Sequence, residues 1–351
     1  MEFEQRIKGF IRWGHALQAL LEERFSNQGE SIDNPLNNIV QSAYRANPWF
    51  TPENSVRALQ SYADWLSESS LKHWLSAYPA LHRSRNSLKN IGLVLAGNIP
   101  AVGFHDVLCV LASGNRASIK LSQDDALLLT FLLEVLMDVD QDFKSLIQIA
   151  YKFQDIDAVI ATGSNNSARY FDYYFGKYPH IIRKNRNAAA IISGNESHEE
   201  LNALGKDIFS YFGLGCRNVS HLFVPEGYDF SSFFEAMEPY GEALMQHNKY
   251  MNNYDYHRAL FLLNSETFLT NNFLLLREHA QLSTPVSVLH YSVYSSADEL
   301  QRVLSVNVEG LQCVVGEGHL PFGTAQHPGL SDYADGIDTM QFLLDLDQSR
   351  S

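Results

Sequence analysis

The sequence predicts an α/β protein with two α/β domains, parallel-rich sheets and an N-terminal helical segment. From residue 91 onward, short runs of Val, Ile, Leu and Ala alternate with helical stretches, which is typical of parallel strands buried on both faces. Residues 1–90 instead carry apolar side chains every three or four positions, the period of a helix that buries one stripe. The length of 351 residues allows two cores, because single cores stop growing near about 250 residues.

Four regions follow from these patterns. We expect a helical scaffold over residues 1–90, packed on the cofactor domain, and a nucleotide-binding α/β domain over 91–205. A catalytic α/β domain over 206–325 and a C-terminal tail over 326–351 complete the chain.

The helices are predicted by periodicity and by their first residues. An apolar stripe from Ile7 to Phe25 predicts the first helix, and Thr51 followed by Pro52 marks the start of another, with a side-chain cap and a proline where no N–H is needed. Ser197 with Glu200 forms a capping box, and Ser296 caps a helix near Glu299. The strands are predicted over residues 91–96, 117–121, 157–161, 188–192, 219–224, 259–263, 286–293 and 312–315.

The bulk composition excludes several classes of protein. A net charge of −14 disfavours binding to nucleic acid or an anionic membrane, since that affinity comes largely from Lys and Arg. No segment reaches the roughly 18 apolar residues of a membrane span, and the acidic N-terminus has no apolar signal region. We therefore expect a cytoplasmic protein. Three N-x-Ser/Thr triplets, at Asn165, Asn195 and Asn218, carry no weight without a secretory signal.

Three cysteines are spread far apart in the chain. Cys109, Cys216 and Cys313 form no C-x-x-C pair and have no histidine at ligand spacing, so we expect neither disulfides nor a metal site. Cys109 and Cys313 stand among aliphatic residues and are expected in the core. Cys216 differs: glycines precede it and Arg217 follows it, just before a predicted strand. Such a setting suits a reactive thiolate, although a small buried hydrophobe is the alternative.

Polar residues stand where three predicted strands end. Asn98 follows the first strand, where its amide can donate to an oxyanion or simply form a turn. Lys120 ends the second strand, within reach of ribose or phosphate or merely solvated, and Gly163-Ser164 follow the third, where a helix begins. Ligands of open α/β sheets bind beyond such strand ends.

In this order, with Cys216 downstream, these segments resemble the aldehyde dehydrogenase superfamily over residues 91–345. Asn98-Ile99-Pro100 is similar to the segment with the oxyanion asparagine, and Lys120-Leu121-Ser122 to the segment that contacts the adenosine ribose. Cys216 falls at the position of the nucleophile. The resemblance therefore implies Cys216 and Asn98 as catalytic residues. It implies cofactor contacts for Lys120, Ser122, Gln123, Gly163, Ser164 and Phe322, the last in the Pro321-Phe322-Gly323 motif. The stretch from Pro285 to Leu311 also resembles a segment of the superfamily.

Departures from the pattern indicate a branch of the superfamily. Ile182 stands where hydrolytic members have a glutamate base, so water receives no help and a thiol such as coenzyme A becomes the natural acyl partner. With residues 320–326 and 332–336, the chain most resembles the acyl-CoA reductases related to the fatty-acid reductase subunit of bacterial luminescence systems. Gln123 replaces an acid that contacts the 2′-oxygen in NAD-preferring relatives, which favours NADPH over NADH. Gln281 stands where a glutamate contacts the nicotinamide ribose.

The resemblance implies an NADPH-dependent reduction of an acyl-CoA or related thioester to an aldehyde through an acyl-Cys216 enzyme, with coenzyme A as the leaving group. Two alternatives stay open: a catalytically silent nucleotide-binding or assembly subunit, and an NAD-linked hydrolytic aldehyde dehydrogenase. A homodimer and an acyl-transferring partner subunit are both compatible with the sequence. The basic cluster of Arg183, Lys184 and Arg186 is either a phosphate site or a solvated charge run.

Overall fold

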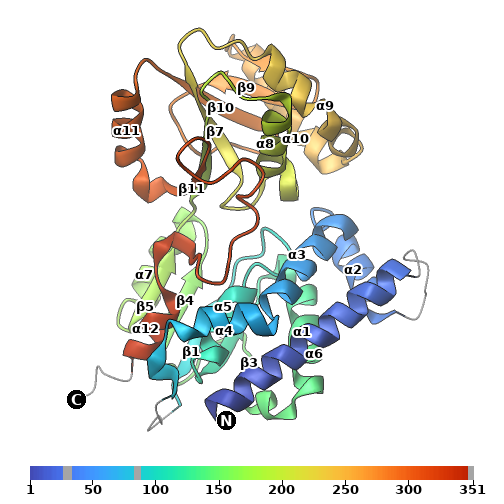
Figure 1. The fold of residues 1–351 in the computed structure, drawn as a ribbon, viewed down its shortest axis with the longest axis vertical. Coiled ribbons are helices and arrows are strands. Elements are labelled where there is room, and N and C mark those ends of the chain that lie inside the picture. The colour runs from blue at the N-terminus through green and yellow to red at the C-terminus, as the bar shows by residue number, and fades with distance from the viewer. Residues whose placement is uncertain (27–33, 83–87, 347–351) are drawn as a thin grey trace. The chain divides into compact units, whose positions relative to one another are not determined.

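The computed structural model describes residues 1–26, 34–82 and 88–346, which form two compact units, each with its own sheet (Figure 1). Unit 1 comprises Met1–Lys184 and Gly329–Ser351, and unit 2 comprises Asn185–Pro328. The α/β class with parallel-rich sheets and an N-terminal helical segment is confirmed. No helix in the described ranges is both long and apolar enough to cross a bilayer.

Unit 1 begins with four helices, α1(Phe3–Ser26), α2(Pro35–Ala46), α3(Pro52–Trp65) and α4(Glu68–Ser76). Helix α1 buries Phe10, Trp13, Leu17 and Leu21 completely, so the predicted stripe faces a core, and it packs on α2, α3, α5 and α6. Phe25, the last member of that stripe, is exposed. The Thr51 hydroxyl accepts a hydrogen bond from the Asn54 N–H at 3.3 Å, which confirms the predicted start of α3.

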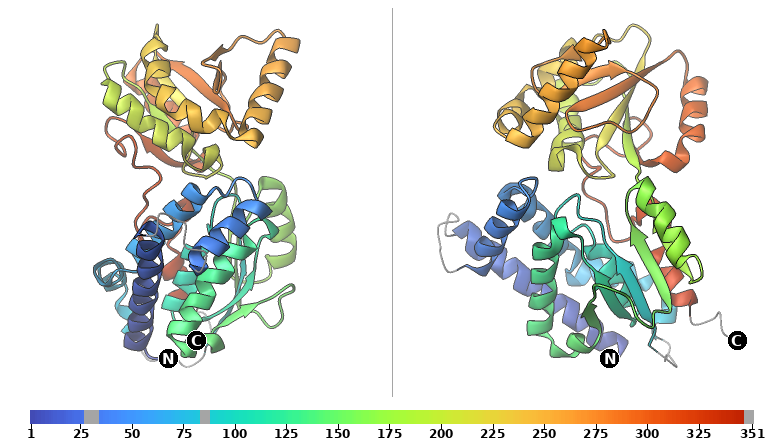
Figure 2. Two further views of the ribbon diagram at one scale, coloured as in Figure 1. Left: turned by 90° about the vertical axis from the view of Figure 1, so that its right-hand side faces the viewer. Right: turned by 180° about the vertical axis from the view of Figure 1, so that it is seen from behind.

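The sheet of unit 1 is parallel throughout and has the order β3-β2-β1-β4-β5. Its elements are β1(Asn90–Val94), α5(Phe104–Ala112), β2(Arg116–Lys120), α6(Ala126–Val139), β3(Ile147–Ile149), β4(Ala158–Thr162), α7(Asn165–Phe175) and β5(His180–Arg183). The chain moves from β1 outward to β3 and then returns past β1 to β4. Because such crossovers are right-handed, α5 and α6 cover one face of the sheet and α7 the other (Figure 2).

The C-terminal segment folds back onto unit 1 through buried polar contacts. Helix α12(Thr339–Asp345) packs on α5. The Arg183 guanidinium, at the end of β5, donates to the Asp106 carboxylate of α5 at 2.5 and 2.7 Å and to the Thr339 hydroxyl at 2.7 Å. All three residues are buried. In the same segment, the Tyr333 hydroxyl accepts a hydrogen bond from the Trp74 indole at 2.7 Å.

Unit 2 contains a six-stranded sheet with the order β11-β6-β7-β10-β9-β8, in which only the β8–β9 pair is antiparallel. Its strands are β6(Asn187–Ile191), β7(Val219–Pro225), β8(Leu269–Thr270), β9(Leu275–Glu278), β10(Val288–Tyr294) and β11(Leu311–Val315). Helices α8(His198–Phe209), α9(Ser231–Met245) and α10(Asn248–Leu263) lie on one face, and α11(Ala297–Val306) lies on the other (Figures 1 and 2).

Most predicted strands of unit 2 exist, but the strand expected over residues 259–263 is wrong. These residues are the last turn and a half of α10. The run Ala259-Leu260-Phe261-Leu262-Leu263 reads as a strand because it is uniformly apolar, yet Leu262 and Leu263 are exposed. The capping box of Ser197 and Glu200 is confirmed at the start of α8, and Ser296 caps α11 by accepting the Glu299 N–H.

The buried ion pair of unit 1 provides a stability prediction. Asp106→Ala leaves the Arg183 guanidinium without its carboxylate in a site where Arg183 is 4% exposed. We expect a loss of about 3–5 kcal/mol in the free energy of unfolding, measured by urea denaturation. Arg12→Ala is the control, because Arg12 pairs with Asp140 from a half-exposed side chain and should cost at most about 1 kcal/mol. Equal losses would contradict the assigned role of the buried pair.

Candidate active site

In unit 1, three loops with predicted site residues meet at one edge of the sheet. Asn98 follows β1, Lys120 ends β2 with Ser122 just after it, and Gly163-Ser164 follow β4. Since β2, β1 and β4 are parallel neighbours, their carboxyl ends lie side by side. The chain reverses its direction of progress between β1 and β4, and this switch point is where open α/β sheets bind ligands. These residues lie at strand ends, as the sequence predicts.

The loops of this edge lie against one another with little space. A Cβ atom added to Gly97 would lie 2.4 Å from the Ser122 Oγ, so only glycine allows the β1 loop to meet the β2 loop. Ser164 caps α7 by accepting the Ser167 N–H at 3.2 Å, and Gly163 precedes it. Backbone N–H groups of a glycine and of the helix N-terminus beside it bind phosphate. This segment therefore suits the phosphates of a dinucleotide. Lys120 and Gln123 are exposed at the same edge.

The loop that carries Asn98 is held by hydrogen bonds from helix α3. The Tyr62 hydroxyl of α3 lies 3.1 Å from the Pro100 carbonyl and 3.0 Å from the Ala101 carbonyl. Ala101 has a φ of 50°, a left-handed conformation that residues with a Cβ rarely adopt. Such a backbone persists only where surrounding contacts hold it. The chain therefore supports the shape of this loop with a buried tyrosine.

Asp125 packs against the same loop and is not among the site residues that the sequence predicts. Its side chain is 4% exposed, and its Cβ lies 3.1 Å from the position of a Cβ on Gly97. Burial raises the pKa of the carboxyl to about 8, although the backbone N–H groups of Ala101 and Val102 oppose this shift. Neither carboxyl oxygen completes a hydrogen bond among the described residues, so burial dominates. The Asp125 carboxyl is therefore mostly protonated near neutral pH.

In unit 2, Cys216 is presented at the surface in a tight turn. The Asn218 N–H donates to the Gly215 carbonyl at 3.0 Å, which makes Cys216 and Arg217 the central residues of a β-turn that leads into β7. Cys216 is exposed, whereas Cys109 is fully buried and Cys313 is partly buried in β11. The prediction that Cys313 is a core residue is therefore only partly correct. Burial raises the pKa of the Cys109 thiol well above its ordinary value, which makes it a poor nucleophile.

A buried carboxylate joins α8 to the loop of the Pro321-Phe322-Gly323 motif. The Asp207 carboxylate accepts the Gly323 N–H at 2.6 Å and the Ala325 N–H at 2.9 Å. Arg217, next to the cysteine, donates to the Ala325 carbonyl at 2.6 Å. Burial raises the pKa of Asp207 to about 6. The cysteine turn and the motif loop therefore share one anchor near the end of α8.

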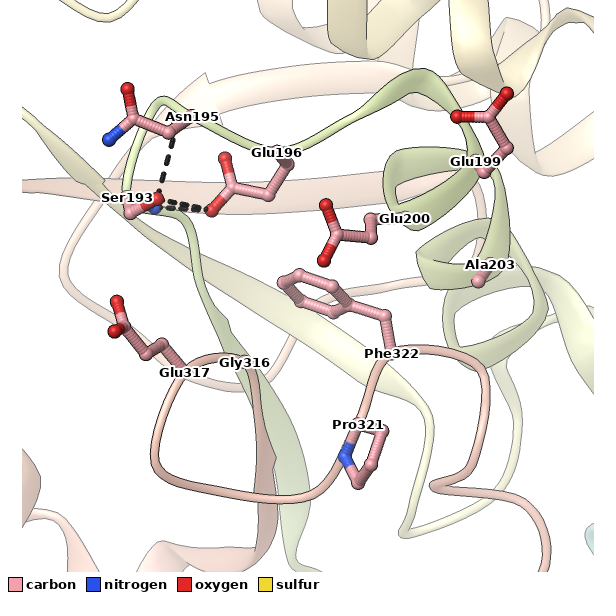
Figure 3. A pocket seen from close by; sticks show the side chains of 10 residues that line it. All are labelled: Ser193, Asn195, Glu196, Glu199, Glu200, Ala203, Gly316, Glu317, Pro321 and Phe322. Carbon is pink, nitrogen blue, oxygen red and sulfur yellow. Dashed lines mark hydrogen bonds between the residues drawn. The ribbon is translucent and has the colours of Figure 1, made fainter.

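A cavity of unit 2 lies toward the other end of α8. It has a volume of about 570 Å³ and includes Phe322, and Figure 3 shows four glutamates around it. Glu199 and Glu200 come from the first turn of α8, whereas Cys216 follows its last turn. The glutamates and their neighbours in the lining are Ser193, Asn195, Glu196, Glu199, Glu200, Ala203, Gly316, Glu317 and Pro321. Cys216 is not among the residues that line this cavity, and the acidic lining repels phosphate.

Gln281 lies between β9 and β10 in a loop held by two histidines. Its backbone carbonyl lies 3.3 Å from the His221 Nδ1 and 2.8 Å from the His290 Nδ1. Burial lowers the pKa of His221 to about 4, so this imidazole is neutral at physiological pH. The Gln281 side chain is exposed and donates to the Ser283 hydroxyl at 2.9 Å. The Gln281 side chain, which stands where relatives have the ribose-binding glutamate, is therefore at the surface of unit 2.

The basic cluster does not act as one site. Arg183 is committed to Asp106 and Thr339 inside unit 1. Arg186 belongs to unit 2, where its guanidinium donates to the Leu311 carbonyl at 3.2 Å. Ile182 lies in β5, paired with Ala161 of β4. Arg183 ends β5, whereas Lys184 and Arg186 lie in the segment between β5 and β6, so the two arginines form their bonds in different units.

Comparison with known proteins identifies the family. A model described as "Acyl-CoA reductase (LuxC)" matches residues 40–247, which is more than half of the chain. The chain belongs to the LuxC acyl-CoA reductase family. Membership of this family indicates that the protein is an oxidoreductase that acts on acyl or aldehyde groups and uses a nicotinamide cofactor. None of the curated proteins compared with the chain matches it.

Solved structures share the fold at low sequence identity. HpcC from Thermus thermophilus is 12% identical, with 90% of this chain and 70% of that chain covered and a TM-score of 0.61. An aldehyde dehydrogenase from Bacillus cereus, solved with NAD+, is 12% identical over 90% and 72%, with a TM-score of 0.59. Aldehyde dehydrogenase 21 from Physcomitrella patens, solved with succinate, is 12% identical over 96% and 84%, with a TM-score of 0.60. These likenesses show the aldehyde dehydrogenase fold.

The buried Asp125 predicts a pH dependence of stability. Because its pKa is raised from an ordinary value of 3.8 to about 8, the folded protein keeps a proton that the unfolded chain releases. The contribution of this group to stability therefore falls as the pH rises from about 4 to about 8. We expect Asp125→Asn, which is uncharged at any pH, to gain thermal stability relative to wild type over this interval and to keep that gain above pH 8. Melting temperatures from pH 5 to 9 measure it.

The neighbouring exposed carboxylate supplies the matched control. Asp124→Asn should shift the melting temperature by the same small amount at every pH, since Asp124 is exposed. A constant difference between Asp125→Asn and wild type across the range would show that Asp125 is ionised throughout.

Proposed function

We propose that this protein reduces an acyl-CoA thioester to an aldehyde with NADPH, through an acyl group carried on Cys216. The observation that carries the proposal is the exposed Cys216 in a β-turn before β7, in a chain of the LuxC family. An exposed thiol in a fixed turn suits attack on a bound thioester, whereas Cys109 is buried.

In the proposed reaction, the Cys216 thiolate attacks the thioester carbonyl. The backbone N–H of Cys216 and the side-chain amide of Asn98 donate to the oxyanion that forms. The oxyanion collapses, the carbon–sulfur bond to coenzyme A breaks, and the acyl group remains on Cys216. When bound, the nicotinamide cofactor supplies the hydride that reduces this thioester, and the resulting thiohemiacetal then releases the aldehyde and restores the thiolate. Ile182 offers no base, which protects the acyl-enzyme from water.

The edge of unit 1 supports the cofactor part of the proposal. Lys120 ends β2 and Ser122 and Gln123 follow it, where the adenosine ribose is expected. Gly163-Ser164 at the start of α7 suit the pyrophosphate. Lys120 is a cation available for a 2′-phosphate, and Gln123 does not repel one. The four glutamates around Phe322 repel anions, so the group that contacts Phe322 is expected to be uncharged or cationic. An oxidised nicotinamide ring is one example.

Removal of the thiol tests the reaction directly. Cys216→Ala should abolish acyl-CoA-dependent oxidation of NADPH, followed as loss of nicotinamide absorbance with acyl chains of increasing length. Cys313→Ala, in the same unit, is the control and should keep turnover within about twofold. Iodoacetamide should modify Cys216 much faster than Cys109 or Cys313, as peptide mass analysis measures. Full turnover in Cys216→Ala would overturn the proposal, and acid release from free aldehyde without coenzyme A would favour a hydrolytic dehydrogenase.

Gln123 provides a test of cofactor preference. Gln123→Glu places a carboxylate where a 2′-phosphate is expected, so we expect KM for NADPH to rise by about tenfold or more while KM for NADH stays the same or falls. Gln123→Ala separates charge from contact, since it removes the amide without adding a carboxylate. Equal KM changes for the two cofactors in Gln123→Glu would contradict this placement of the ribose.

A further inference from the structure

The backbone before Cys216 has an unusual conformation. Tyr211 and Phe212 have φ values of 51° and 58°, and Gly213 has 78°, so three consecutive residues are left-handed. Residues with a Cβ avoid this region because the Cβ approaches the following carbonyl oxygen. The segment follows α8 directly, so the chain leaves the helix axis and the last carbonyls of α8 lose their regular partners.

Asn218 supplies the missing donors. Its side-chain amide nitrogen lies 3.0 Å from the Asp207 carbonyl, 3.2 Å from the Ile208 carbonyl and 2.8 Å from the Ser210 carbonyl. Two N–H groups thus serve three oxygens, which requires one shared hydrogen bond. Asn218 is 2% exposed, so water does not compete for these carbonyls. The same burial means that the Asn218 triplet is not a surface acceptor for glycosylation.

The other end of the carboxamide holds the cysteine turn. The Asn218 Oδ1 accepts the Gly215 N–H at 2.7 Å, and the Asn218 N–H donates to the Gly215 carbonyl at 3.0 Å. Gly215 and Asn218 are therefore joined twice, with Cys216 and Arg217 between them. The Asn218 carbonyl accepts the Ala188 N–H at 3.1 Å, which ties the turn to β6. Only a side chain that donates at one atom and accepts at another can make this set of bonds.

We propose that Asn218 is the positioning residue of the nucleophile: its carboxamide fixes the left-handed segment and the Gly215–Asn218 turn, and so sets the direction of the Cys216 thiol. This inference rests on the proposed function, since it names the group that holds the nucleophile of that reaction. Asn218 acts through the turn and touches neither substrate nor cofactor. A displacement of about 1 Å in a reacting group costs roughly 100-fold in rate.

Two substitutions test the role. Asn218→Ala removes all side-chain bonds, and Asn218→Asp keeps the acceptor but places a carboxylate against three carbonyls. We expect kcat with acyl-CoA to fall by about 100-fold in both at pH 8, with KM for NADPH within twofold of wild type because the cofactor binds unit 1. In Asn218→Asp, kcat relative to wild type should rise again as the pH falls from 8 to 5, because a protonated carboxyl regains one donor. If Asn218 only stabilised the fold, kcat of the folded Asn218→Asp variant would not recover at low pH.

Asn202 is the matched control. It lies in α8 of the same unit, and its amide donates one hydrogen bond, to the Ala236 carbonyl at 3.0 Å. Asn202→Ala should lower the melting temperature while kcat stays within twofold of wild type. Folded Asn218 variants, checked by circular dichroism, with kcat within twofold of wild type at every pH would overturn the inference.

Hydrogen exchange decides the question even where the variants fold poorly or the enzyme is inactive. In the wild-type protein, the Gly215 amide should exchange at least 100-fold more slowly than an open turn, because its acceptor is the buried Asn218 Oδ1. Exchange at the rate of an open turn would overturn the role of Asn218. A wild-type protein without acyl-CoA reductase activity would remove the proposed function instead, and the Gly215 amide would still report whether the carboxamide holds the turn.

Discussion

Parallel strand pairing is the constraint on which both units depend, because it determines which residues can meet. In unit 1 the ends of β2, β1 and β4 are neighbours, so loops from residues 97, 120 and 163 share one edge. In unit 2, parallel pairing places the cavity and the cysteine turn at opposite edges of the sheet. The cavity with Phe322 follows the carboxyl ends of β6 and β11, whereas Cys216 precedes β7 at the opposite edge. Helix α8 connects the two edges, and its 12 residues span about 18 Å. The anchor of Asp207 on Gly323 and Ala325 shows how the motif loop returns toward the cysteine turn.

The strands and the residues at their ends could be predicted from the sequence because hydrophobic periodicity, apolar runs and helix caps are local signals. Most of the sheet, the capping box of Ser197 and the shared edge with Asn98 were predictable for this reason. Periodicity alone does not separate a short apolar run from a helix end, so residues 259–263 were misjudged. The site residues that were missed are Asp125 and Asn218. Each is a polar residue that is buried against backbone distant in the sequence or strained, and the order of residues reveals neither burial nor strain.

The distribution of charge constrains how an acidic chain binds an anionic cofactor. Arg183 is buried on Asp106, and carboxylates surround Phe322, so among the described residues neither place offers a free cation to a phosphate. In the proposed cofactor site, phosphate would instead meet local charges: the N–H groups at the start of α7 and the cation Lys120. These act over a few ångströms and are less sensitive to net charge than a basic surface is. A protein of net charge −14 can bind a nucleotide in this way.

The strain near Cys216 and the bonds of Asn218 are similar in size. A left-handed conformation costs roughly 1–2 kcal/mol for a residue with a Cβ, which gives about 2–4 kcal/mol for Tyr211 and Phe212 together. A typical hydrogen bond contributes about 1 kcal/mol net, so the four side-chain bonds of Asn218 offset this cost without a large surplus. The carboxamide bonds are thus of the size needed to offset this strain. Strained backbone persists where surrounding groups determine it, and such places are common at functional sites. The coincidence of strain, a buried polar side chain and an exposed thiol within eight residues is the physical reason to place the chemistry at this turn.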